Sequence, residues 1–357
     1  MRFLIFAISI FAITSTFAKE DDLDDLITYH PYYVPQAKKY SQGHLIENSQ
    51  IMPGYNAPAK IDIGKELDVF AAATYLFYQP IEKGLVYAQT SDNPTVTIGK
   101  FFEMHSSYKS AFKVALGFST NKDDWAYTAE YTRIHFSKVK SVQQIAINTW
   151  IHFATIPEEM TDIRAKWGLK LDTLDLTFER SFYGGTYLIL TPLFGVKGGY
   201  LDQSFNTDST RRSDAALLYS RSKIDSHLIG LIGGAKTKLL FFWGFNLFAD
   251  VKASLLYQKF KVKNRQNNAT TPSTLFDNSI NTIRYINPNL LLSTGLEWGS
   301  YFSKKTKHVS FLVGYDANVF FHQNLMVELK DLRINSRTAD AGDLFFHGII
   351  ANLKLNF

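Results

Sequence analysis

The stretch that decides the fold is WGFNLFADVKASLLYQKFKV, which runs from Trp243 to Val262. Apolar and polar residues alternate along most of it, and a period of two predicts an extended strand with two unlike faces. The apolar face carries Phe245, Leu247, Ala249, Val251, Ala253, Leu255 and Tyr257. The polar face carries Asn246, Asp250, Lys252, Ser254 and Gln258.

The length of this alternation separates two all-β architectures. It continues for about 14 residues, whereas sandwich strands commonly have about 5 or 6 residues and a tilted membrane strand needs about 9 to 11. The stretch HVSFLVGYDANVFFHQ, residues 308–323, repeats the pattern at similar length. We therefore predict an all-β fold, a transmembrane antiparallel β-barrel, with a secreted β-sandwich as the alternative.

The first 18 residues, MRFLIFAISIFAITSTFA, predict export. Arg2 precedes an apolar run, and small residues at Thr16 and Ala18 suit a signal peptidase that cuts after Ala18. A membrane anchor is the weaker alternative, because the run is shorter than the roughly 20 residues of a spanning helix. No later uncharged apolar stretch reaches the length of such a helix.

Residues 19–66 differ in texture from the remainder of the chain. They open with the acidic run KEDDLDDL and contain Pro31, Pro35, Pro53 and Pro58, which predicts an extended leader. This leader could plug the barrel or trail away from it. Residues 67–357 then form a single barrel domain.

Eleven strands are predicted, and an even-numbered barrel would have about 12, within a range of roughly 10 to 16. Residues 140–154 could supply the twelfth strand or form a helix in a loop. The eleven predicted strands are residues 67–78, 84–90, 108–119, 125–137, 163–180, 186–203, 226–240, 244–263, 283–301, 307–323 and 344–357.

Four segments read as long external loops, and one of them is expected to fold inward and narrow the pore. They are residues 138–162, 204–223, 263–282 and 324–343. Within LKLDTLDLTF, residues 169–178, the apolar positions change parity, so a bulge is expected near Asp172 to Leu174.

Charged residues in the middle of the predicted strands are candidates for the lining of a water-filled pore. They are Lys113, Glu130, Lys170, Lys197, Lys236, Asp250, Lys252, Glu297 and Asp316, and Asp172 belongs to the same group. Opposed charges across a constriction would order water and favour small polar solutes. The simpler interpretation is that they are ordinary solvated residues. Aromatic girdles are expected at Trp125, Tyr127, Tyr200, Tyr257, Trp298 and Tyr315.

The last residues, FFHGIIANLKLNF, form a two-faced strand that ends on Phe357. Ile349, Ala351, Leu353, Leu355 and Phe357 should face lipid, while Asn352, Lys354 and Asn356 face water. A closing strand of this type resembles the signal that the outer-membrane insertion machinery reads. We expect Ile349, Leu353, Leu355 and Phe357 to carry that signal.

Other classes of function find little support in the composition. The chain has no Cys, and its net charge of +5 comes from scattered Lys and Arg rather than a nucleic-acid footprint. There is no GxSxG motif, and the nine His residues lack the spacing of metal ligands. We expect no catalytic site, no metal, no cofactor and no nucleic-acid partner.

Several stretches together resemble the chlamydial and legionella-type major outer-membrane porin family. Among them are DVFAAATYLFYQPIEKGLVYA, FKVALGFSTNKDDWAYTAEYTRIHF and LEWGSYFSKKTKHVSFLVGYDANVFFHQN. The resemblance implies an outer-membrane β-barrel that admits ions and small hydrophilic solutes, without catalysis, and homo-oligomers that are often trimers. The missing cysteines mean that the envelope-crosslinking role of some members does not carry over. A surface adhesin or structural barrel with little transport is the alternative function.

Overall fold

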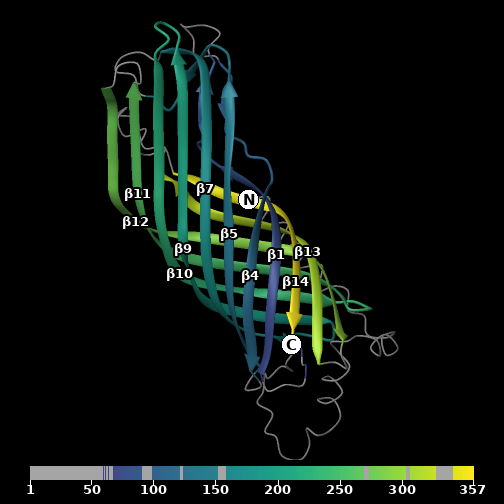
Figure 1. Ribbon diagram of the computed structural model, residues 1–357. Coiled ribbons are helices and arrows are strands. Elements are labelled where there is room, and N and C mark those ends of the chain that lie inside the picture. Colours follow the sequence, from purple (N-terminus) through teal and green to yellow (C-terminus); the bar gives the residue numbers. More distant parts are fainter. Residues whose placement is uncertain are drawn as a thin grey trace, which may run out of the picture.

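The computed structural model describes residues 59, 61, 63, 67–90, 99–120, 124–151, 158–268, 273–302, 306–326 and 341–357. The predicted signal peptide and almost all of the leader lie outside these residues, as does most of the segment 324–343. Strands make up nearly all of the described chain (Figure 1). Among the described residues, no helix has the length and the apolar run needed to cross a bilayer.

Ten strands close into an antiparallel ring. Neighbours pair in the order β7-β5-β4-β1-β14-β13-β12-β11-β10-β9, and the pairing of β7 with β9 closes the ring. The strands are β1 (Leu67–Glu82), β4 (Lys109–Thr120), β5 (Trp125–Val142), β7 (Glu159–Arg180), β9 (Leu188–Arg211), β10 (Leu217–Leu240), β11 (Phe245–Asn268), β12 (Ser273–Phe302), β13 (Lys307–Asn324) and β14 (Gly342–Asn356). The predicted all-β barrel is confirmed.

The ring has two strands fewer than the expected 12, within the expected range. Residues 84–90 form only the short β2 (Val86–Gln89), and residues 140–154 complete β5 and form β6 (Ala146–Asn148). The strands β2 and β6 are not members of the ring, and neither are β3 (Phe101–Glu103) and β8 (Phe182–Tyr183). The short strands β6, β2 and β3 pair in that order from β7.

Two of the four predicted loops are mostly strand, so this part of the prediction was wrong. β9 continues to Arg211 and β10 begins at Leu217, while β11 continues to Asn268 and β12 begins at Ser273. Their backbones pair along most of this length, but their outer faces are polar. Figure 1 shows these long strands rising beyond the rest of the barrel. We call this the distal end; the opposite, proximal end carries Leu67 and Phe357.

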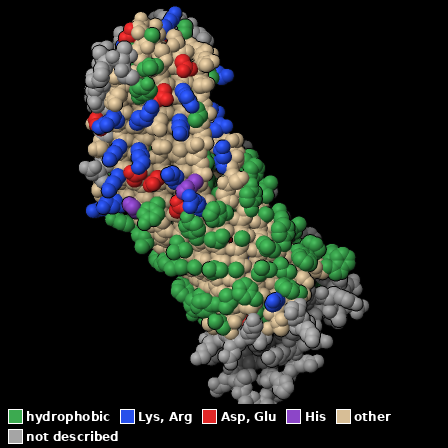
Figure 2. All heavy atoms as spheres, in the orientation of Figure 1, with side chains coloured by type: hydrophobic (Ala, Val, Ile, Leu, Met, Phe, Trp, Pro, Cys, Tyr) green, Lys and Arg blue, Asp and Glu red, His purple; other side chains and the backbone are tan. Residues whose placement is uncertain are grey.

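The outer face changes polarity across one row of paired residues on six adjacent strands. We call the first polar row the boundary row: Arg133, Asp172, Tyr200, His227, Lys259 and Arg284. The next outward row toward the proximal end is mostly apolar: Tyr131, Leu174, Gly198, Ile229, Tyr257 and Ile286. Figure 2 shows the resulting apolar band with basic side chains above it.

The inner face also changes polarity near the boundary row, but in the opposite direction: it is mostly apolar on the distal side and charged on the proximal side. The inward row just distal to the boundary row is mostly apolar: Ile134, Leu171, Leu201, Ser226, Phe260 and Ile283. The second inward row on the proximal side of the boundary row contains Glu130, Asp175 and Lys197. The chain therefore keeps its strand parity while its environment changes.

The predicted bulge near Asp172 to Leu174 was wrong, because the pairing of β7 is regular there. β7 pairs without a register shift from Ile163 to Arg180 on β5 and from Asp162 to Glu179 on β9. Leu169 and Leu171 are buried inside, whereas Leu174 and Leu176 are exposed outside. Apolar residues change parity because the apolar environment moves from the interior to the lipid-facing surface.

The apolar band has the height of a bilayer. On β11 it runs from Phe245 to Tyr257, which at about 3.3 Å per residue and a tilt of about 45° spans about 28 Å. Trp298 lies opposite Phe245 near the proximal rim, while Tyr200 and Tyr257 lie at the distal rim. Aromatic residues at both rims are typical of the interfaces of a membrane barrel.

A charge in the middle of this band should destabilise the barrel. Val251 is outward and midway between Phe245 and Tyr257, so Val251→Arg should lower the free energy of unfolding in lipid bilayers by about 2–4 kcal/mol. Ser137→Arg, outward but distal to the boundary row, is the matched control and should change it little. Equilibrium unfolding with denaturant measures both; equal losses would contradict the assigned membrane boundary.

Candidate functional site

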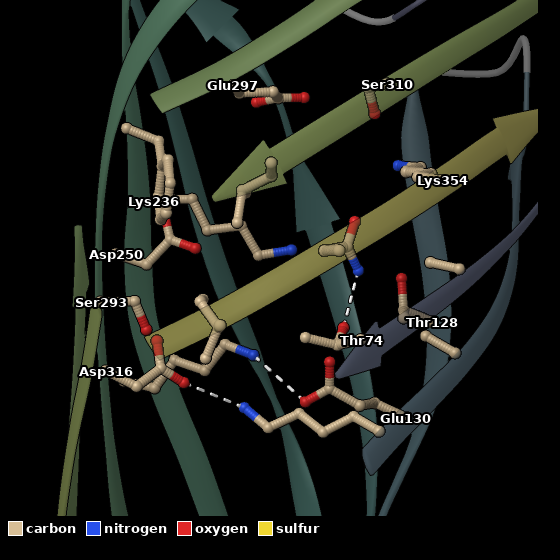
Figure 3. Close-up of a pocket in the computed structure, with 18 of the residues that line it drawn as sticks. Thr74, Thr128, Glu130, Lys236, Asp250, Ser293, Glu297, Ser310, Asp316 and Lys354 are labelled. Atoms are coloured by element: carbon tan, nitrogen blue, oxygen red, sulfur yellow. Dashed lines mark hydrogen bonds and ion pairs between the residues drawn. The ribbon is translucent and has the colours of Figure 1, made fainter. Parts of the chain in front are cut away.

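The proximal half of the barrel interior holds a dense cluster of charged side chains. Alternate residues of each strand point inward, so every second position between the boundary row and the proximal end lines the lumen. The cavity has a volume of about 180 Å³, and five lysines and five carboxylates line it: Lys113, Lys236, Lys238, Lys252, Lys354, Glu130, Glu179, Asp250, Glu297 and Asp316. Figure 3 shows their side chains converging from many strands.

Two ion pairs cross the lumen between strands that are not neighbours. Lys113 on β4 lies 3.3 Å from the carboxylate of Asp316 on β13, and Lys252 on β11 lies 3.7 Å from Glu130 on β5. The hydroxyl of Tyr78 donates a 2.5 Å hydrogen bond to Asp316. Figure 3 shows both pairs as dashed lines. They place opposed charges across the bore.

Three further pairs join strands that are adjacent or one apart. Lys197 and Asp175 lie opposite each other on β9 and β7, with 2.9 Å between nitrogen and oxygen. Lys236 pairs with Glu179, and Lys238 lies 2.6 Å from Glu297. Each lysine of these pairs therefore has its own carboxylate.

Asp250 and Lys354 share the same cavity but form no ion pair with any residue the structure describes. The Lys354 ammonium lies over the ring of Phe70, 3.8 Å from its centroid, a geometry in which the ring face attracts the cation. The Asn352 amide on the same strand donates to Thr74 at 2.7 Å. These are the two charged groups of the cavity whose charge is not directly compensated.

Eight of the nine predicted lining residues do face inward. Lys170 is the exception, because it lies on the exposed outer face of β7 distal to the boundary row. Asp172 is also outward, where it accepts hydrogen bonds from Tyr131 and pairs with His135 at 2.6 Å. Both residues were assigned inward from a parity that is correct only where water lies inside and lipid outside.

Three other residues of the cluster are inward and ion-paired but were not among the candidates: Asp175, Glu179 and Lys238. The misread parity of β7 hid Asp175 and Glu179, whereas Lys238 has the parity of the candidate Lys236 on β10 and was overlooked. Counting β7 by twos from Thr173 would have found Asp175 and Glu179 on one face, opposite Leu174, Leu176 and Phe178. That signal is present in the sequence once the change of environment is known.

Beyond the boundary row the lumen is closed by an apolar core. We call residues 146–151 the inward segment, because they are largely buried and contact inward-facing residues of the distal wall. The buried ring of Trp150 packs on Phe205 of β9, with 4.6 Å between centroids, and the Gln266 amide of β11 donates to the Trp150 carbonyl at 3.0 Å. Asn148 donates to Thr207 at 3.1 Å. One long predicted loop, residues 138–162, therefore supplies the inward-folding segment.

The C-terminal strand closes the ring between β13 and β1. Ile349, Leu353, Leu355 and Phe357 are exposed on the outer face, as the alternation indicated. Asn352, Lys354 and Asn356 have the opposite parity and point inward. Within the described residues, no three His, Asp or Glu side chains gather into a set that could hold a metal ion.

Comparison with known proteins identifies a family. The model of the Legionella pneumophila major outer membrane protein precursor matches residues 64–357. No curated protein matches the chain. Similar solved structures include a Pseudomonas aeruginosa FadL homologue, with 8% identity, TM-score 0.29 and coverage of 82% of this chain and 90% of that one. The CymD monoaromatic hydrocarbon channel has 11% identity, TM-score 0.27 and coverage of 82% and 88%. The family match spans the whole barrel, and the chain belongs to the Legionella major outer membrane protein family.

Proposed function

We propose that this outer-membrane barrel conducts ions and small hydrophilic solutes by passive diffusion. The observation that supports this best is the cluster of paired charges inside a ring whose outer face is apolar. Charged side chains avoid an apolar interior unless they are paired or hydrated. Their number and spacing suit a hydrated path through the membrane rather than a packed core.

Such a pore would be narrow. Eight-stranded barrels leave an interior that side chains fill, while 16 to 18 strands leave a wide aqueous channel. A ring of ten strands lies near the lower limit. Ion pairs that cross the bore reduce the free width further and impose a transverse field on whatever passes, so size and dipole should govern permeation.

Conduction would also require the distal interior to open. The apolar row and the inward segment form a hydrophobic constriction, and constrictions of this type gate pores by excluding water. The inward segment is the element best suited to move, because it is not one of the ten strands that close the ring and its backbone pairs with the ring only at two positions of β7. We propose that it acts as the gate.

Liposome swelling tests the transport function. Proteoliposomes containing the purified protein should admit small sugars faster than large ones, whereas empty liposomes should admit neither. An absence of both swelling and conductance, together with binding to host cells, would instead support the adhesin or structural role, for which the long polar distal strands provide a surface. Assembly into trimers stays a prediction of the family resemblance, and recognition by the insertion machinery stays a prediction from the C-terminal strand.

Charge reversal in the bore should change its ion selectivity. Lys197→Glu with Lys252→Glu would place carboxylates beside Asp175 and Glu130, so the reversal potential in planar bilayers should move toward cations. Lys170→Glu alters an outward residue and should leave it unchanged. If the double variant does not fold, Lys197→Gln with Lys252→Gln should give a smaller shift of the same sign. An unaltered reversal potential in both would remove these lysines from the conduction path.

A reversible crosslink should test the gate. The chain has no Cys, and Asn148 on the inward segment contacts Thr207 on the wall, so Asn148→Cys with Thr207→Cys introduces a single candidate disulfide. Oxidation should lower the single-channel conductance or open probability, and a reducing agent should restore it. Each single Cys variant is the control. Identical conductance in the oxidised and reduced states would exclude movement of this segment as the gate.

A further inference from the structure

The outer face of β10, β11 and β12 carries a basic patch directly distal to the apolar band. We define the basic patch as Lys223, Lys259, Lys261, Lys263 and Arg284, all outward on the long strands. Lys259 and Arg284 belong to the boundary row, so the patch begins one residue pair away from Tyr257 and Ile286 in the apolar band. It therefore lies at the depth of lipid headgroups.

The pairing within this sheet sets like charges opposite one another. Lys223 faces Lys263 across β10 and β11, and Lys259 faces Arg284 across β11 and β12. Like charges in directly opposite cross-strand positions destabilise a sheet. Two such pairs in adjacent hairpins suggest that an anion normally lies between the side chains.

Little within the protein neutralises the patch. Asp225 forms an ion pair with Lys223 and lies opposite Lys261 on β11. Lys259, Lys263 and Arg284 have no ion pair with any described carboxylate and no carboxylate opposite them on a neighbouring strand. On β7 the arrangement differs, because Arg164, Lys166 and Lys170 face Asp208, Asn206 and Asp202 of β9. The distal outward residues of β1, β13 and β14 include Ile81, Phe321 and Phe345. Like charges therefore face one another on β10 to β12, whereas two of these three cations of β7 face carboxylates.

We infer that the basic patch binds the phosphate groups of a phosphorylated glycolipid in the surrounding leaflet. In an outer-membrane barrel, short turns face the periplasm and longer extensions face the exterior, so the distal patch lies in the outer leaflet. Lysine and arginine side chains supply several donors to phosphate oxygens. The acyl chains of the same lipid would lie against the apolar band beneath. This inference does not depend on the pore function.

Binding of lipid A to the purified protein in neutral detergent micelles tests the inference. The probes are bis-phosphorylated lipid A, the same lipid without its phosphates, and inorganic pyrophosphate. Each lysine near an anionic surface contributes about a fivefold gain in affinity, so Lys259→Gln with Lys261→Gln and Lys263→Gln should weaken binding of the phosphorylated lipid roughly a hundredfold. The dephosphorylated lipid should bind the wild type no better than it binds this variant.

The control is Arg164→Gln with Lys166→Gln and Lys170→Gln, which removes three charges from the same face on β7. It should retain most of the affinity. The heat-dependent shift in gel migration reports folding. If the Gln variant does not fold, replacement of Lys259, Lys261 and Lys263 by Arg keeps the assay informative, because this variant should retain the affinity for the phosphorylated lipid. Equal loss in the β7 control, unaltered binding by the Gln variant, or equally tight binding of pyrophosphate would overturn the lipid assignment.

Discussion

The structure depends on one constraint, the need to satisfy every backbone hydrogen bond inside a bilayer. Hydrocarbon offers no partner to a free N–H or C=O group, so a sheet that crosses it must close on itself. The pairing of β7 with β9, separated in the sequence only by β8 and its turns, meets this condition. Once the ring is closed, each strand has only two environments for its side chains, and the identity of those environments decides the remaining features of the molecule.

Those two environments exchange places along the barrel axis. In the proximal half lipid lies outside, so apolar residues point outward and the lysine-carboxylate pairs point inward. In the distal half water lies outside, so the interior must provide the hydrophobic core that keeps the long strands together. Trp150, Trp167 and Phe205 are fully buried there. The apolar closure of the lumen is thus a direct consequence of strands that extend into water, and a pore through this protein requires part of that core to move.

Alternation of apolar and polar residues predicted at least part of all ten ring strands, the barrel fold and the outward face of the last strand. It was insufficient where the environment changed without a change of parity. Lys170 and Asp172 were placed in the lumen because the leucines beside them were taken as lipid-facing, although Leu169 and Leu171 are interior. The distal halves of β9 to β12 were taken as loops because their outer faces are polar. Pairings across the lumen, such as Lys113 with Asp316, join residues 203 positions apart and leave no local pattern.

The charged residues are arranged differently on the inner and outer faces of the barrel. Inside, five lysines have their own carboxylates, so the bore has a strong transverse field without a large excess of either sign. A lumen of this kind, if it conducts as proposed, should discriminate by width and polarity more than by the sign of a solute's charge. Outside, cations face cations on β10 to β12, where we propose that lipid phosphates bind. The proposed selectivity and the proposed lipid binding therefore depend on different lysines, and because successive residues of a strand point to opposite sides, each set can change without disturbing the other.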